Sequence, residues 1–362
     1  MLPAATGHHT PHAPMRLATR ESPLAMAQSH MVARMLRQVC PGLTVEFVPI
    51  RSHGDAEQTR SLETLGRESG VGVGLFTKAL DEALLCGAAD IAVHSCKDYP
   101  TSIPAGLVAA AYPNRADVRD ALVVPLRALA ACGIAPGALS TPEVLRQLMQ
   151  HQPGASIGTG SPRRRAQLEA LCPQLATAEV RGNVGTRLRK LLGGQYAALL
   201  MAKAGLDRLG CHACPELAHV AVLPFESDEL MPAPAQGVLL ITCRATDGPT
   251  RGLMEWIDSP AARLEATAER ACLKAVGGGC FVALGAHAHL DAATATLQVR
   301  TVMATHGPAG EVCLHRAHCH GPAGEALQLG TAAGLQLLEA TRPGSKGAET
   351  GGAAPSTDRA LG

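Results

Sequence analysis

Apolar and polar positions follow two alternating patterns along this chain, and their order predicts a mixed α/β protein. Short apolar runs of strand length, such as residues 15–19 (MRLAT) and 89–95 (ADIAVHS), stand next to segments in which apolar residues have helical spacing. Residues 24–39 (LAMAQSHMVARMLRQV) form such a segment, which Gly42 closes, and residues 44–50 (TVEFVPI) form the next apolar run. Strands that alternate with helices indicate a largely parallel sheet.

The same alternation starts again after a looser stretch, residues 127–153, in which we expect only a short surface helix. Apolar runs at residues 155–159 and 196–202 enclose helical patterns at residues 161–171 and 184–192. Two similar αβ lobes in one chain predict a ligand-binding cleft between them.

The pattern changes again after residue 256, where long helical segments flank alternating strands and predict a small α+β domain. The expected organisation is a disordered extension (1–14), a first lobe (15–117 and 230–256), a second lobe (118–229), the α+β domain (257–342) and a disordered tail (343–362).

Composition narrows the function classes. The chain has 32 Lys and Arg against 31 Asp and Glu, so no overall basic charge points to nucleic acid. No apolar run approaches the length of a membrane span, and the first residues lack the pattern of a secretory signal. The 12 cysteines are irregularly spaced, which does not resemble a disulfide framework and favours a reducing cytoplasm.

Arginine is concentrated between residues 157 and 190, close to predicted strand ends and helix starts. Ser22 and Ser161 each precede a proline at a predicted helix start, and such helix starts offer free backbone N–H groups to an anion. Arginine forks match carboxylates or phosphates, so we expect a ligand with several anionic groups. A solvated basic face is the alternative interpretation.

Two further residues have open roles. Asp98 follows a buried strand and is a candidate for stabilising positive charge or for proton transfer, or else it caps the next turn. Cys280, in AVGGGCFVALG, is a candidate nucleophile or attachment point, or else a small residue in a tight turn. The pairs in CHAC (211–214) and CLHRAHCH (313–320) lack zinc-finger spacing, and we predict no metal site.

Several stretches resemble the porphobilinogen deaminase (hydroxymethylbilane synthase) family. They occur in the family's order and are RLATRESPLAMAQ (16–28), GLFTKALDEALLCGAADIAVHSCKDYPT (74–101), IGTGSPRRRAQL (157–168), VRGNVGTRLRKL (180–191), AGLDRLG (204–210), PAPAQG (232–237) and AERACLKAVGGGC (268–280). The resemblance implies two lobes like those of periplasmic binding proteins and a small α+β domain that carries a cysteine loop. It also implies an enzyme that joins four porphobilinogen molecules head to tail, releasing ammonia and finally hydroxymethylbilane for tetrapyrrole synthesis.

The resemblance assigns site residues by position. Cys280 would hold a dipyrromethane cofactor through a thioether, and Asp98 would stabilise positive charge during the reaction. The implied cofactor-binding residues are Lys97, Ser161, Arg163, Arg164, Arg187 and Arg208. The implied substrate-binding residues are Arg20, Ser22, Gln28, Lys78, Thr159 and Arg181.

The chain departs from the family pattern at several of these motifs: Val73 replaces a lysine, Pro162 replaces a leucine, residues 234–237 read PAQG, Gly277 replaces an acidic residue, and Phe281 replaces a polar one. We expect a cytoplasmic monomer that hands its product to uroporphyrinogen-III synthase. The competing interpretation is a non-catalytic two-lobed binding protein for an anionic small ligand.

Overall fold

The computed structural model describes residues 14–50, 77–135, 137–278, 282–308, 310–342 and 349–350. These residues form two compact units. Unit 1 comprises the chain up to Arg115 together with Val238–Arg263, and unit 2 comprises Ala116–Gly237 together with the chain from Leu264. Among the described residues, no helix has both the length and the apolar character needed to cross a bilayer.

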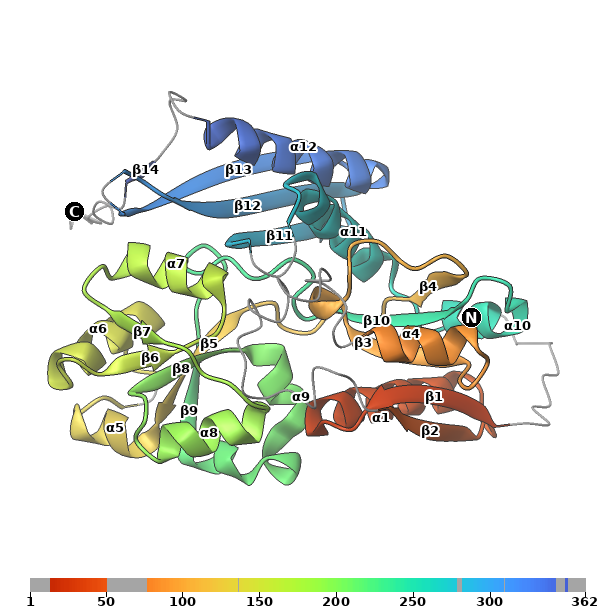
Figure 1. Cartoon of the computed structure of the whole chain (residues 1–362), viewed down its shortest axis with the longest axis horizontal. Helices are drawn as coiled ribbons and strands as arrows, with labels where there is room; N and C mark the ends of the chain where they lie inside the picture. The colour runs from red at the N-terminus through yellow and green to blue at the C-terminus, as the bar shows by residue number, and fades with distance from the viewer. Residues whose placement is uncertain are drawn as a thin grey trace. The chain divides into compact units, whose positions relative to one another are not determined.

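Unit 1 is built on a five-stranded sheet in the order β2-β1-β3-β10-β4 (Figure 1). Its elements are β1 (Met15–Arg20), α1 (Pro23–Val39), β2 (Val45–Ile50), α4 (Lys78–Leu85), β3 (Ile91–Ser95), the 3-10 turn η1 (Cys96–Asp98), β4 (Leu107–Ala111), β10 (Leu239–Arg244) and α10 (Gly248–Glu255). The strands expected at residues 15–19, 44–50 and 89–95 and the helix α1 are confirmed.

The lobe of unit 2 contains a second five-stranded sheet in the order β7-β6-β8-β5-β9. Its elements are β5 (Asp120–Pro125), α5 (Leu126–Ala131), α6 (Thr141–His151), β6 (Ser156–Gly158), α7 (Pro162–Leu171), β7 (Ala176–Ala178), α8 (Val184–Leu192), β8 (Ala198–Ala202), α9 (Lys203–Ala213), the 3-10 turn η2 (Pro215–His219) and β9 (Val220–Pro224).

The two sheets share one plan. In each, three neighbouring strands are parallel, and a strand from a distant part of the chain then pairs antiparallel on both of its sides. That strand is β10 in unit 1 and β5 in unit 2, and each follows a point where the chain passes from one unit to the other. The expectation of two αβ lobes is therefore confirmed.

Side-chain alternation along the strands explains the cores. Leu17 and Ala18 are both fully buried and belong to separate apolar clusters, because successive residues of a strand point to opposite faces of its sheet. The first cluster includes Val32 and Leu36 of α1, and the second includes Leu80 and Leu84 of α4.

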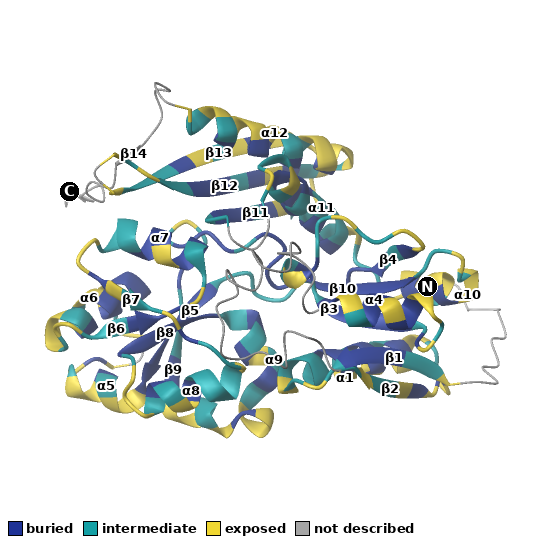
Figure 2. Cartoon of the chain, in the orientation of Figure 1, coloured by how far each residue is buried: buried dark blue, intermediate teal, exposed yellow. Residues whose placement is uncertain are grey.

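The expectation for residues 127–153 was wrong in part. This stretch forms two helices, α5 and α6, where one short helix was expected. Figure 2 shows that α6 has both exposed and buried positions, and its apolar residues Val144, Leu145 and Leu148 are buried. With Leu129 of α5 they join the main core of the second lobe. Pro142 lies in the first turn of α6, where a proline is tolerated, and Gly133 and Gly137 lie outside both helices, so the loose composition concealed their apolar faces.

The C-terminal domain confirms the expected α+β arrangement. Its elements are α11 (Pro260–Ala275), β11 (Leu284–Asp291), β12 (Thr296–His306), β13 (Val312–Pro322), the 3-10 turn η3 (Ala323–Glu325), α12 (Ala326–Ala340) and β14 (Glu349–Thr350). The short strand β14 pairs with β13 inside the stretch predicted as a tail, and the rest of that stretch apart from 349–350 lies outside the described residues.

Helices α11 and α12 approach each other closely because small residues line their contact. A Cβ added at Gly330 of α12 would collide with the backbone carbonyl of Ala268 in α11, and one added at Gly334 would lie 2.8 Å from the carbonyl oxygen of Cys272. Backbone atoms cannot move aside cheaply, so these two positions exclude any side chain.

The substitution Gly330→Ala is therefore expected to lower the free energy of unfolding by about 1–3 kcal/mol, as overpacked cores do. Gly324→Ala is the matched control, since nothing lies within 4 Å of a Cβ at that position. Urea unfolding of both variants measures the difference, and equal stabilities would contradict the close contact of the two helices.

Candidate functional site

Unit 1 has a small pocket of about 80 Å³ that brings together four of the predicted site residues, Arg20, Ser22, Gln28 and Asp98. The pocket lies where β1 and β3 end and α1 and α4 begin. Because β1 and β3 are parallel, their carboxyl ends meet at one edge of the sheet, which is where open α/β sheets bind ligands.

Local sequence places the side chains of this pocket. Ser22 caps α1 by accepting a hydrogen bond from Ala25 N at 3.3 Å, with Pro23 at the first helical position, as predicted. The amide of Gln28, buried on α1, donates to Ser95 Oγ at 2.9 Å. The Asp98 carboxylate is exposed and makes no hydrogen bond within the described part of the chain, so it does not cap the following turn.

His94 lies at the same pocket and is fully inside the protein. Burial lowers the pKa of its imidazole to about 3, with a smaller contribution from Arg20, so the ring is neutral. Its Nε2 lies 3.0 Å from Thr242 Oγ1 in β10. His94 therefore forms part of the pocket wall without contributing charge. Arg20 and Asp98 are the charged groups among the described residues that line the pocket.

Two predicted residues of unit 1 do not line this pocket. Lys78, at the start of α4, is exposed and lies 3.9 Å from Glu82, while Lys97 precedes Asp98 in η1. Thr77, which the sequence analysis missed, does line it, and its buried hydroxyl oxygen has no hydrogen-bond partner within the ranges that the structure describes.

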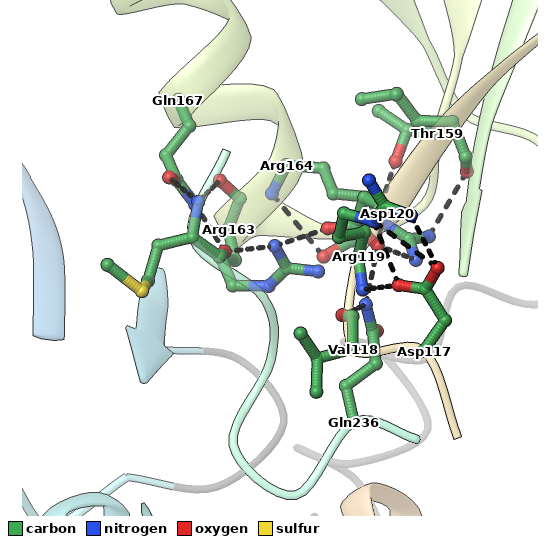
Figure 3. Close-up of polar contacts among 12 residues, drawn as sticks. Asp117, Val118, Arg119, Asp120, Thr159, Arg163, Arg164, Gln167 and Gln236 are labelled. Carbon is green, nitrogen blue, oxygen red and sulfur yellow. Dashed lines mark hydrogen bonds and ion pairs between the residues drawn. The ribbon is translucent and has the colours of Figure 1, made fainter. Parts of the chain in front are cut away.

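In unit 2, the predicted ligand-binding residues Arg163 and Arg164 both contact one buried carboxylate, that of Asp120 (Figure 3). Arg163 Nη1 donates to Asp120 Oδ2 at 2.6 Å, and Arg164 donates from Nη2 at 2.6 Å and from Nε at 3.0 Å to Oδ1. Gln236 Nε2 donates to the same Oδ1 at 2.9 Å. Asp120, the first residue of β5, is 0% exposed. Its buried carboxylate accepts hydrogen bonds from two arginines of α7 and from Gln236, in the segment that leads back to unit 1.

Burial alone would raise the pKa of Asp120, but the charges of Arg163 and Arg164 outweigh it, and the pKa lies below its usual range. Asp120 is thus ionised, and one negative charge faces two positive ones. The surplus positive charge is in line with the predicted anionic ligand, although both guanidinium groups are already bound to the protein.

The crossing segment, residues 231–237, is anchored to the same cluster. Gln167 on α7 accepts a hydrogen bond from Met231 N at 2.7 Å and donates one to Met231 O at 3.0 Å. Gly237 has φ +85°, and a Cβ there would lie 2.5 Å from the carbonyl oxygen of Ala116, so only glycine fits. Ala235, in the PAQG departure, has φ +60°, a conformation that favours glycine.

The remaining arginines differ in how far the protein neutralises them. Arg181 Nε donates to Glu179 at 2.8 Å, and Arg187 Nε donates to the carbonyl of Gly182 at 2.8 Å. Arg208 donates from Nη2 to the carbonyl of Gly237 at 2.6 Å, while its buried Nε has no hydrogen-bond partner among the described residues. Burial lowers the pKa of Arg208 to about 10, and the negative charge of Asp207 offsets only part of that effect.

Thr159 and Ser161 shape the start of α7. The Ser161 side chain caps the helix by accepting from Arg164 N at 3.5 Å, and Ser161 N donates to Thr159 Oγ1 at 3.3 Å. Pro162 occupies the first helical position, where a missing N–H breaks no helical hydrogen bond, so this departure from the family pattern keeps the helix start intact.

Cys280, Phe281 and Val73 lie outside the described residues. Gly277, which precedes Cys280 and Phe281, has φ +70°, and nothing lies within 4 Å of a Cβ at this position. The glycine that replaces an acidic residue therefore suits a turn after α11. Cys214 of the CHAC pair is buried with its Sγ 3.3 Å from Glu216 Oε2, and Cys211 is exposed. The described residues contain no group of three or more side chains that could hold a metal ion.

The sequence analysis also missed Asp120, Gln167 and Gln236. A signal for Asp120 existed, because an acidic residue directly before the apolar run ALVV must either face water or meet a cation. The two glutamines had no such signal, because they bond to distant segments of the chain: Gln167 to the backbone of Met231, and Gln236 to the carboxylate of Asp120.

Comparison with known proteins agrees with the motifs. Residues 15–251 match the family described as "Porphobilinogen deaminase, dipyromethane cofactor binding domain", and residues 263–339 match "Porphobilinogen deaminase, C-terminal domain". The chain is 40% identical over 331 residues to a porphobilinogen deaminase of Acidothermus cellulolyticus, covering 90% of this chain and 89% of that protein. It is 41% identical over 277 residues to one of Roseiflexus castenholzii, covering 76% and 82% of the two chains.

Solved structures show weaker likeness. The GluR0 ligand-binding core in complex with L-glutamate matches with a TM-score of 0.34 and 10% identity, covering 68% of this chain and 90% of the other. The effector binding domain of a BenM variant matches with a TM-score of 0.37 and 14% identity, covering 67% and 92%.

The substitution Asp120→Asn is expected to lower the free energy of unfolding by about 3–5 kcal/mol, because it leaves two buried guanidinium groups without their anion. Glu226→Gln is the control, since the ion pair of Glu226 with Arg119 is exposed and should contribute less than about 1 kcal/mol. Denaturant unfolding measures the free energy of unfolding of both variants. An equal decrease in the two would contradict the conclusion that the buried ion pairs of Asp120 contribute more than an exposed one.

Proposed function

The chain belongs to the porphobilinogen deaminase family. We propose that residues of both units bind the cofactor and the substrate of that enzyme. Members of the family are transferases of porphyrin synthesis, and their substrate is porphobilinogen. The family's matching domain is named for a dipyrromethane cofactor. The assignment of individual residues below is a proposal.

Unit 2 would hold the cofactor. The buried Arg208 supports this, because its Nε has no acceptor within the described part of the chain, so an acidic ligand group would fit there. Arg163 and Arg164 bring two positive charges against the one of Asp120, and Arg187 and Ser161 add further donors. Cys280 would form the covalent thioether. When bound, the cofactor supplies the pyrrole carbon to which substrate is joined.

Unit 1 would bind and activate the substrate. The observation that supports this most is the pocket that combines Arg20, Ser22 and Gln28 with the exposed Asp98. Arg20, Lys78 and the start of α1 would bind substrate carboxylates, whereas Lys97 would bind the cofactor. Thr159 and Arg181 of unit 2 remain proposed substrate contacts.

Asp98 would act electrostatically. Loss of ammonia from porphobilinogen leaves positive charge on its pyrrole, and a fixed carboxylate stabilises such charge without the need to reorganise. Because Asp98 has no hydrogen bond within the described part of the chain, its oxygens are available to accept from pyrrole N–H groups.

Three finer points belong to the same proposal. The enzyme would release ammonia in each of four additions, act as a monomer, and pass hydroxymethylbilane to uroporphyrinogen-III synthase. It would work in the cytoplasm, in keeping with the free thiols found at the cysteines of the described residues.

Intact-protein mass spectrometry tests the cofactor assignment. Wild-type protein made in a host that supplies porphobilinogen is expected to carry an added mass of two pyrrole units, and Cys280→Ser is expected to lack it. Cys211→Ser is the matched control, because Cys211 is an exposed free thiol in the same unit. An unmodified wild-type chain would instead favour a two-lobed binding protein.

Turnover of porphobilinogen tests Asp98. Asp98→Ala is expected to lower kcat by about 10²-fold or more, the scale of a lost electrostatic contact to the transition state, while the cofactor mass persists. Glu46→Ala, at an exposed position on β2, serves as the control and should keep its activity. Near-normal turnover in Asp98→Ala would remove the assigned role.

A further inference from the structure

Asp81 and Tyr99 form a buried polar pair next to the unit 1 pocket, and no step of the reaction uses it. Asp81 lies on α4 and is 5% exposed, and Tyr99 directly follows Asp98 and is 2% exposed. The Tyr99 hydroxyl donates to Asp81 Oδ1 at 3.0 Å. Burial raises the pKa of Asp81 to about 6, and the hydrogen bond from Tyr99 opposes that rise. Without the Tyr99 hydroxyl, the buried carboxylate of Asp81 would lose a hydrogen bond, and this loss would destabilise the fold.

Tyr99 is also held from the opposite side. Its ring packs against the imidazole of His94, with 4.6 Å between ring centroids, and His94 is in turn hydrogen-bonded to Thr242 of β10. The backbone N–H of Tyr99 donates to Cys96 O at 3.2 Å, and Cys96 N donates to Val238 O at 3.0 Å. The turn η1 is therefore fixed to the sheet by its backbone, and the hydrogen bond from Tyr99 to Asp81 connects the end of this turn to α4.

That hydrogen bond connects two walls of the pocket. Thr77, one helical turn before Asp81, lines the pocket together with Asp98. Asp98 has no side-chain hydrogen bond of its own within the described part of the chain, so the orientation of this residue toward the pocket depends on the backbone of η1. Electrostatic stabilisation depends on a charged group that is already in place, and hydrogen bonds that hold its backbone support this.

We propose that Asp81 and Tyr99 are positioning residues for the reaction, and that the hydrogen bond between them fixes the orientation of Asp98 relative to α4. The proposal rests on the proposed function, since it takes Asp98 as the charge-stabilising group. It predicts that loss of the bond lowers the rate of the chemical step and leaves substrate binding largely unchanged.

The test compares kcat and KM for porphobilinogen in three variants of the cofactor-loaded enzyme. Tyr99→Phe removes the hydroxyl and keeps the ring against His94, and we expect kcat to fall about tenfold with KM changed less than twofold. Asp81→Asn keeps an oxygen that can accept from Tyr99, and we expect it to retain most of the wild-type kcat.

The double variant Tyr99→Phe/Asp81→Leu separates positioning from stability. Replacing both partners with apolar groups removes the unpaired buried carboxylate, so the unfolding midpoint should return toward that of wild type. Positioning predicts that kcat nevertheless stays about tenfold low, because the bond is still absent. Recovery of kcat together with stability would overturn the proposal, as would wild-type kcat in Tyr99→Phe.

These outcomes are distinguishable from failure of the proposed function. Intact mass confirms that each variant carries the cofactor before it is assayed. Normal turnover in Asp98→Ala would reject the role of Asp98 itself. An inactive Asp98→Ala beside a fully active Tyr99→Phe would reject only the positioning role.

Discussion

A buried carboxylate that faces two guanidinium groups persists only when all three are held together, because each charge alone would be costly inside the protein. In unit 2, Asp120 meets this condition through Arg163 and Arg164 of α7. Gln236 donates to the same carboxylate from the segment that leads back to unit 1. The strand, the helix and the crossing segment therefore depend on one ionised group.

The same cluster has a consequence for binding. One acid cannot neutralise two guanidinium groups, and Arg208 in the same unit is buried with a nitrogen that has no acceptor among the residues that the structure describes. In the proposed function, the carboxylates of the cofactor would balance these positive charges. Unit 1 has the complementary feature, an exposed carboxylate at a pocket where Arg20 and Asp98 are the charged groups of the lining.

The crossing segment shows how backbone constraints support this chemistry. Gly237 approaches Ala116 so closely that no side chain fits, and Ala235 adopts a left-handed conformation while its N–H donates to Glu269 at 2.5 Å. In unit 1, η1 is fastened by Cys96 and Tyr99 in a similar way, through backbone and buried side-chain hydrogen bonds. In both units, charged groups with a proposed role lie next to segments whose backbone has little freedom.

Periodicity and capping are local properties, so the two αβ lobes, the α+β domain and the helix starts at Ser22 and Ser161 could be predicted from the sequence alone. It also pointed to Arg20, Ser22, Gln28 and Asp98, which the structure brings to one pocket. It underestimated α6, whose apolar face is recognisable as core only beside α5 and the sheet. Only the tertiary structure decided which arginines are neutralised and which are not, and which acid supports Tyr99. Pairing of buried charges depends on residues far apart in the chain, such as Asp120 and Arg163, and no local pattern encodes that distance.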